Sequence, residues 1–444
     1  MSDLLSLIVT LLIIVIVIVF ILMITQNLNS KGIFYMACIA VVFLLIITAL
    51  FSCSPKKDDN NTECNLVTHE DTLGTPQNNS VRCFSRPTCS ASQTSPSKVL
   101  ADAKASVAPL PEIYPSSPQQ IGSVYLGSGA VPFDGTGKRI GIIGCFYYPN
   151  LQADFNIFCN EFGQKSKQLQ IHQYGTTTNS GWATELCLDT QWCNVFAPNA
   201  TIHVFMAQDD SFSSILIALK NAALAGMDVI SMSFGGDESA SVINDFEPVF
   251  SSYPNILFLA SSGDSDTVSY PSSSPNVISV GGTILSVASN GLDESSGPIV
   301  NKTAIRAGAY TKLAESDWYT PDGNGSGHGT SGYFPKPAYQ AAHNPGGYRS
   351  TPDLSLIAAT PGDMGVFIYC SAAGGWLGVQ GTSLSCPSLA GMLATVNSRR
   401  KTPVTRAQVL TYLYSLASAS LPIDVMVDGA GYINGRTVQA LVSI

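Results

Sequence analysis

The chain has 444 residues, which is enough for one large domain or two ordinary domains with a substantial core. Charged residues make up only 12% of the sequence, and the formal net charge is −9 at pH 7. The sequence has no basic patch, so its composition argues against a nucleic-acid partner.

Two uncharged apolar runs lie near the N-terminus, at residues 4–25 and 33–52. Each run is long enough to cross a bilayer as a helix, and only seven residues, QNLNSKG, separate them. This pattern predicts a transmembrane helical hairpin over residues 1–52. The alternative is a signal peptide followed by one anchor, and the sequence fits it less well because the first residues, MSD, include no Lys or Arg. We therefore expect an integral membrane protein.

Residues 53–108 are rich in Ser, Thr, Pro, Asn and Lys, which predicts a flexible stalk. From about residue 109 onward, short apolar runs alternate with helical patterns. Strands are predicted at 138–146, 201–207, 228–234 and 256–261, and helices at 151–163, 213–227, 239–252 and from about 383 to 399. Buried strands that alternate with helices predict a parallel sheet with helices on both faces, and therefore one α/β domain over 109–444.

Ser383 lies in the stretch GTSLSCPSLAG, where a Gly-Thr pair precedes it and an apolar run at helical spacing follows it. Such a position is typical of a nucleophile at the start of a buried helix. A serine hydroxyl is a poor nucleophile until a neighbouring base removes its proton. The sequence should therefore also supply a base.

Histidine is the usual base for a serine, and His328 is the first of the five histidines to consider. It lies in GSGHGTSG, and subtilisin-type proteases also have His-Gly-Thr around their base. In those proteases the histidine begins a helix after a strand, whereas SGHGTSGYFPKP is Gly-rich and interrupted by Pro, which predicts a loop. His328 remains an alternative base, and it would imply a neutral subtilisin-like protease.

Carboxylates are the other candidate bases. Glu185 and Asp189 lie four residues apart in GWATELCLDTQWCNVF, so a helix would place both on one face, among large apolar side chains. Two carboxylates in such a setting repel each other, and one proton is then shared between them. Asp264 follows an apolar strand in a Ser-Gly-Asp turn, at the strand end where ligands bind in parallel sheets. If protonated, its side chain can stabilise a developing oxyanion.

Six stretches, in order, resemble the sedolisins, or serine-carboxyl peptidases, a family that includes tripeptidyl-peptidase I and kumamolisin. The resemblance covers roughly residues 109–444. The six stretches are ELCLD, SSGDSD, YPSSSPNVISVGGT, SGYFPKPAYQ, RSTPDLS and GTSLSCPSLAG. The resemblance implies a subtilisin-like fold, in agreement with the predicted parallel sheet.

By position, the resemblance implies that Ser383 is the nucleophile and Glu185 the general base. Asp189 would orient Glu185 and share its proton, and Asp264 would be the acid of the oxyanion hole. The implied reaction is hydrolysis of a peptide bond through an acyl-enzyme, with carboxylates in place of histidine. A carboxylate base is ionised while its partners hold protons only in acid, so we expect an acidic optimum. Peptides or proteins would be the substrates, cleaved by an endopeptidase or a tripeptidyl-peptidase.

The sequence departs from the family pattern in three places. The family has a long propeptide before this domain, whereas only residues 53–108 are available here. Asp266 replaces a glycine of the turn that follows Asp264. The family's calcium site corresponds to residues 423–436, and its second aspartate is replaced by Ile433. The retained positions of that site are Asp424, Val425, Gly429 and Gly431. Because calcium prefers six to eight oxygen ligands, we expect a weak site or none, unless Asp428 substitutes.

The sequence gives conflicting indications of the membrane topology. Lys56 and Lys57 beside the second apolar run weakly favour a cytoplasmic domain. Eleven cysteines, among them the pair Cys187 and Cys193 around the acidic residues, favour an oxidising compartment, as does an acid mechanism. We therefore expect a lumenal or extracellular catalytic domain. The alternative to a peptidase is an inactive sedolisin fold that acts as a membrane-displayed binding module.

Overall fold

The computed structural model describes residues 80–88, 92–97, 115–126, 133–289, 310–319 and 324–417. All of them belong to one of the two units into which the chain divides, Glu63–Ile444. The predicted transmembrane runs at 4–25 and 33–52 lie outside these ranges. Within the ranges, no helix has the length and apolar character needed to cross a membrane.

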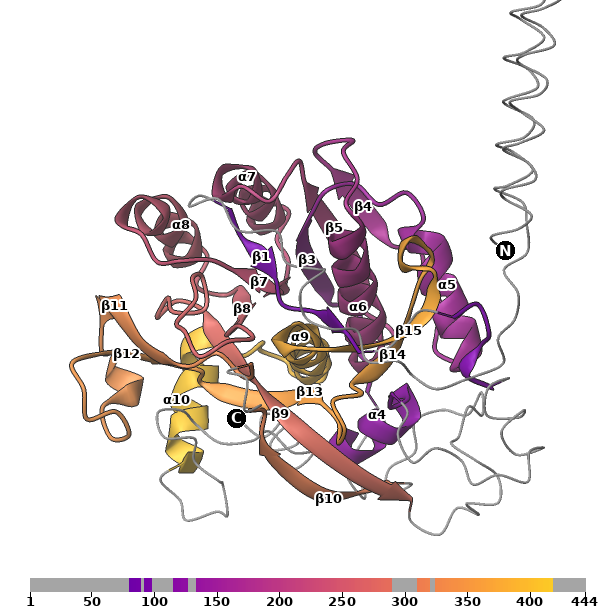
Figure 1. The fold of residues 1–444 in the computed structure, drawn as a ribbon. Coiled ribbons are helices and arrows are strands. Elements are labelled where there is room, and N and C mark those ends of the chain that lie inside the picture. Colours follow the sequence, from indigo (N-terminus) through magenta and orange to yellow (C-terminus); the bar gives the residue numbers. More distant parts are fainter. Residues whose placement is uncertain are drawn as a thin grey trace, which may run out of the picture. The chain divides into compact units, whose positions relative to one another are not determined.

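An eight-stranded sheet lies at the centre of this unit (Figure 1). Its strands are β3 (Arg139–Cys145), β4 (Gln170–Gln173), β5 (Thr201–Ala207), β6 (Val229–Met232), β8 (Leu257–Ser261), β9 (Ile278–Ser289), β10 (Tyr310–Asp317) and β13 (Leu354–Ala359). The strand order is β10-β9-β8-β6-β3-β5-β4, and β13 also pairs with β9. Every pairing is parallel except that of β10 with β9. The predicted α/β class with a mostly parallel sheet is confirmed.

Helices cover both faces of the sheet, with α7 and α8 on one face and α6 and α9 on the other (Figure 1). The helices are α4 (Pro118–Leu126), α5 (Leu151–Glu161), α6 (Ser180–Phe196), α7 (Phe212–Leu224), α8 (Ala240–Ser252), α9 (Thr382–Ser398) and α10 (Arg406–Ala417), with 3-10 turns η2 (Ala338–Gln340) and η3 (Ser371–Ala373). Successive side chains of a strand point to opposite faces. Ile142 therefore packs in the core beside α6 and α9, and Ile143 packs in the core beside α7 and α8.

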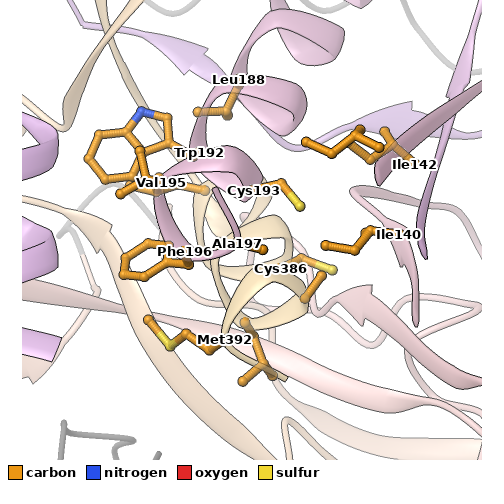
Figure 2. Packing of buried hydrophobic residues seen from close by; sticks show 14 of the residues in the cluster. Ile140, Ile142, Leu188, Trp192, Cys193, Val195, Phe196, Ala197, Cys386 and Met392 are labelled. Carbon is orange, nitrogen blue, oxygen red and sulfur yellow. The ribbon is translucent and has the colours of Figure 1, made fainter. Parts of the chain in front are cut away.

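Helices α6 and α9 pack closely against each other, and Figure 2 shows the apolar side chains around their contact. A Cβ atom at Gly391 of α9 would lie 2.6 Å from the carbonyl oxygen of Cys193 in α6. A side chain at this position would push the helices apart, so glycine permits the close approach. This close approach matters because α6 includes Glu185 and Asp189, and the second residue of α9 is Ser383.

The remaining strands lie outside the main sheet. They are β1 (Arg82–Cys83), β2 (Arg86–Pro87), β7 (Phe234–Gly235), β11 (Gly329–Pro335), β12 (Tyr348–Thr351), β14 (Val366–Cys370) and β15 (Gly375–Gln380). β1 pairs antiparallel with β7, and β2 pairs antiparallel with β15, which also pairs with β14. Residues 80–88 are thus part of the folded unit, although the sequence assigns them to the stalk. Val81 and Phe84 are 2% and 3% exposed, and two apolar side chains in a polar stretch are too few for composition to detect.

Candidate active site

Ser383 is the second residue of α9, directly after the point where β15 ends, and its side chain is fully buried. Gly381 between the two elements has φ +130°, a backbone conformation that favours glycine. The Ser383 hydroxyl donates a hydrogen bond to the carbonyl oxygen of Ser233 at 3.1 Å. It accepts one from the main-chain N–H of Phe84, also at 3.1 Å.

Glu185 and Asp189 lie on α6, whose first turn is capped by the side chain of Asn179. They are 1% and 0% exposed. The Ser233 hydroxyl donates to one Asp189 oxygen at 2.6 Å. The other Asp189 oxygen and both Glu185 oxygens have no hydrogen-bond partner in the part of the chain that the structure describes. Ser233 thus contacts both the candidate nucleophile and the second acid.

The pKa values of these two acids are raised, and burial is the main cause for both. The hydroxyls of Ser383 and Ser85 oppose the rise in the pKa of Glu185, whereas the negative charge of Glu185 adds to the rise in the pKa of Asp189. Two buried carboxylates under these conditions hold a proton well above the usual pH range for carboxylic acids. The geometry is that of an acid–carboxylate pair beside a serine.

Asp264 lies in the turn after β8, and one of its oxygens accepts hydrogen bonds from the N–H and the hydroxyl of Thr382, both at 2.8 Å. Its other oxygen, Oδ2, is buried without a hydrogen bond within the described ranges. Burial raises the pKa of Asp264 to about 6, although the positive charge of Arg86 opposes this. A carboxyl group with such a pKa is protonated in mild acid and can then donate a hydrogen bond.

A strand of the chain itself lies across these residues. The carbonyl oxygen of Phe84 accepts a hydrogen bond from the N–H of Ser383 at 3.3 Å. A Cβ atom at Gly381 would collide with that carbonyl oxygen and would lie 2.7 Å from Asp264 Oδ2, so both oxygens border one small space. The Arg86 guanidinium donates to the main-chain oxygen of Asp264 at 2.7 Å and lies 3.6 Å from Oδ2. With β1 and β2 paired on either side, residues 82–87 are bound as a peptide would be.

His328 lies elsewhere. Its ring Nε2 lies 3.1 Å from a carboxylate oxygen of Asp266, its Nδ1 lies 3.1 Å from the Ser326 carbonyl oxygen, and its side chain is 42% exposed. No hydrogen bond joins it to Ser383 among the described residues. Asp266, the residue that departs from the family turn, therefore has a partner in His328. The structure does not support His328 as a base for this serine.

The structure places Ser383, Glu185, Asp189 and Asp264 in one region, and the other predicted site residues lie outside the described ranges. The latter are the calcium positions Asp424, Val425, Gly429, Gly431 and Ile433. Sequence reasoning missed Ser233, for which the only signal was a hydroxyl residue at the end of an apolar strand. It also missed Phe84 and Arg86, which reach the site only through long-range pairing.

The sequence from 174 to 430 matches the model of the subtilase family of peptidases. The chain belongs to the subtilase family. The predicted resemblance to the sedolisins is also confirmed, because this subtilase is 33% identical over 176 residues to sedolisin of Pseudomonas sp. (strain 101) and 26% identical over 245 residues to kumamolisin of Bacillus sp. (strain MN-32). The matches cover 38% and 50% of this chain, and 26% and 40% of the length of those relatives.

The fold of this subtilase resembles that of a solved Pseudomonas sedolisin, a serine-carboxyl proteinase complexed with two molecules of pseudo-iodotyrostatin. The TM-score is 0.55 at 22% identity, over 75% of this chain and 87% of that chain. At this identity the likeness establishes the fold alone. It agrees with the mostly parallel sheet and the two-sided helical cover described above.

Proposed function

We propose that this subtilase hydrolyses peptide bonds in acid through an acyl-enzyme formed on Ser383. The observation that supports this most directly is the binding of residues 82–87 across the site. A peptide carbonyl accepts the N–H of Ser383 at 3.3 Å, next to a buried acid whose second oxygen has no other hydrogen bond in the described part of the chain. A substrate bound in the same way would present its carbonyl group to the serine and to two potential oxyanion donors.

In the proposed first step, Ser383 Oγ attacks the substrate carbonyl carbon while its proton passes to Glu185. The resulting oxyanion accepts hydrogen bonds from the Ser383 N–H and from protonated Asp264. The carbon–nitrogen bond then breaks as Glu185 returns the proton to the leaving amine, which leaves an acyl-enzyme. Water, deprotonated by Glu185, attacks the ester and releases Ser383. Asp189 shares the proton of Glu185 and, held by Ser233, keeps that side chain in position.

The acidic optimum follows from the protonation states that these steps need. Asp264 has to be protonated to donate, and its pKa is about 6. Glu185 has to be ionised to accept a proton, so its pKa, raised to about 8 while the strand fills the site, has to fall when the strand leaves and the acid pair is hydrated. Activity should therefore decline as the pH rises above about 6.

The strand of residues 82–87 also implies that the enzyme is latent, that is, inactive until this strand leaves the site. While Phe84 occupies the site, its N–H and carbonyl use the same atoms of Ser383 that a substrate would need. The Arg86 charge beside Asp264 lowers the pKa of this acid and so favours its carboxylate, which cannot donate to an oxyanion. An enzyme in this state would bind other peptides only after the strand has left.

We further propose that residues 1–52 anchor the enzyme in a membrane with the catalytic domain on the lumenal or extracellular side. The uncharged runs at 4–25 and 33–52 support the anchor, and the acid mechanism supports the compartment. Protease treatment of sealed microsomes tests this topology. Protection of residues 53–444 is expected, and digestion without detergent would reverse the assignment.

The decisive experiment for the reaction is a peptide-library assay of the purified protein between pH 3 and pH 7, before and after incubation in acid. Peptide cleavage with an optimum below pH 6 is expected, and the length of the products distinguishes an endopeptidase from a tripeptidyl-peptidase. A neutral optimum would favour a subtilisin-like mechanism. Complete inactivity, with the fold intact by circular dichroism, would favour a binding module.

A further inference from the structure

Two cysteines that are distant in the sequence lie together away from the serine. Cys187 is on α6, between Glu185 and Asp189 in sequence, and Cys370 is the last residue of β14. Their sulfur atoms and a carboxylate oxygen of Asp154, on α5, all lie within 4.8 Å of one another. All three side chains are buried, with at most 1% exposed.

The two thiols differ in their surroundings. The S–H group of Cys187 and the main-chain N–H of Ala373 stabilise the thiolate of Cys370, and they lower the pKa of Cys370 to about 7. The hydroxyl oxygen of Tyr148 lies 3.9 Å from the same sulfur atom and acts in the same direction. Burial, by contrast, raises the pKa of Cys187. Cys370 is thus suited to attack first, as a thiolate. Cys187 stays protonated until it attacks second.

One carboxylate oxygen of Asp154, Oδ2, is surrounded by hydrogen-bond donors of the protein. It accepts hydrogen bonds from the N–H of Ser371 at 2.8 Å, from the Ser371 hydroxyl at 3.1 Å and from the Tyr148 hydroxyl. The Cys187 sulfur lies 3.8 Å from the same oxygen. A metal ion would have to displace these donors, whereas a proton acceptor for Cys187 is already in place. The arrangement therefore favours thiol chemistry over metal binding.

We propose that Cys187 and Cys370 form a redox-active pair whose disulfide joins the helix of the two acids to strand β14. The oxidant is a small-molecule disulfide such as oxidised glutathione. The Cys370 thiolate attacks one sulfur of the oxidant, which releases one glutathione thiolate and leaves a mixed disulfide. Cys187 then gives its proton to Asp154 and attacks the Cys370 sulfur, which expels the second glutathione thiolate. Two protein thiols are oxidised and one disulfide is reduced to two thiols.

The position of Cys370 provides a route for the oxidant. The next three residues form η3, where Ala372 is exposed, so a local opening of this turn uncovers the thiolate. Closing the bond brings the sulfur atoms to about 2 Å apart and ties α6 to β14. Such a bond would restrict the helix that includes Glu185, and it would stabilise the fold because it closes a long loop. This inference concerns a different site and does not depend on peptidase activity.

The test uses the full-length protein, equilibrated in glutathione buffers of increasing oxidised fraction, then alkylated and digested for mass spectrometry. We expect a peptide that links Cys187 to Cys370 to appear as the oxidised fraction rises. The melting temperature should rise by several degrees over the same range. Thiols that stay alkylatable in fully oxidised buffer would overturn the proposal, and so would linkage of Cys187 to Cys193.

Variants separate this bond from general effects of oxidation. Cys370→Ser should abolish both the linked peptide and the rise in melting temperature. Cys193→Ser is the matched control, because this buried cysteine lies on the same helix, and it should retain both effects. If Cys370→Ser fails to fold, the linked peptide of the wild-type protein still decides the matter, since it identifies both bonded cysteines directly. Stoichiometric zinc that protects both thiols would identify a metal site and overturn the redox assignment.

Discussion

The main-chain N–H of Phe84 donates a hydrogen bond to the hydroxyl oxygen of Ser383 at 3.1 Å, although 299 positions separate the two residues. The N–H of Ser383 in turn donates to the carbonyl oxygen of Phe84. The chain therefore places one of its own peptide units where the proposed reaction would take place. Under the proposed mechanism, the bond between Phe84 and Ser85 would be the one that Ser383 cuts.

The first prediction concerns this strand. Arg86→Ala removes the guanidinium beside Asp264 and one of the contacts that hold the strand, so basal cleavage of a short peptide at pH 5 should increase several-fold. Incubation of the wild-type protein in acid should produce a fragment that begins at Ser85, detected by mass spectrometry. The Ser383→Ala variant should not produce it. Activation by acid without any cut near residue 84 would show that the strand leaves uncut.

The second prediction concerns the nucleophile. Ser383→Ala should abolish peptide cleavage while the protein stays folded, with a loss of stability of about 1 kcal/mol, because the lost hydroxyl is buried and hydrogen-bonded to Phe84 and Ser233. Ser385→Ala is the matched control on the same helix. Its hydroxyl donates to the carbonyl oxygen of Ile357 at 2.9 Å, so its loss should lower stability by about 1 kcal/mol and leave turnover in place. Turnover retained in Ser383→Ala would contradict the assignment.

The third prediction concerns the base. Glu185→Gln keeps the side-chain volume but cannot accept the serine proton, so kcat should fall by about 10²- to 10⁴-fold. His328→Ala should change kcat less than about two-fold, because the ring of His328 lies beside Asp266 at the surface. Contacts between exposed charged side chains usually have effects of this small size. Steady-state kinetics on one peptide at pH 5 provides both values. If the two variants behaved the opposite way round, the subtilisin-like mechanism would be correct.

The fourth prediction concerns pH. The pKa of Asp264 is about 6 in the folded protein, above the ordinary value of 3.8. A carboxyl group whose folded pKa is raised stabilises the protein fully below the ordinary pKa, and this stability is lost as the pH rises through the folded pKa. The difference corresponds to about 3 kcal/mol, lost between about pH 4 and pH 6. Asp264→Asn should reduce the slope of the stability curve over this interval in denaturant titrations, with the remaining slope coming from Glu185 and Asp189, and it should lower kcat by about 10²- to 10³-fold. An unchanged curve would assign the pH dependence to other groups.

The fifth prediction concerns calcium. On the register that the resemblance implies, Ile433 stands where the family has an aspartate, so we expect the site to lack a carboxylate ligand. EDTA should therefore change the melting temperature only slightly, and added calcium should not raise it. A large decrease with EDTA, reversed by calcium but not by magnesium, would show that Asp428 or other oxygens complete the site.

The sequence alone predicted four strands and four helices of the domain, together with Ser383 and the three candidate acids, but not β4, β9, β10 or β13. Local patterns suffice for these predictions because the apolar run of β3 or a helical run after Ser383 depends on neighbours a few positions away. The spacing of Glu185 and Asp189 likewise fixes their common face on α6. The resemblance to the sedolisins then implied a role for each of these residues without any knowledge of their contacts in the fold.

Only the tertiary structure decided what lies in the site and beside it. Residues 80–88 bind there through main-chain hydrogen bonds to β7 and β15, and nearly any residue can make such bonds, so their sequence gives little sign of it. Ser233 and the pair of Cys187 with Cys370 also depend on contacts between distant segments. Cys193 is closer to Cys187 in the sequence, but on a helix residues six apart lie on different faces. Packing of α6 against β14, which local patterns do not encode, selected Cys370 instead.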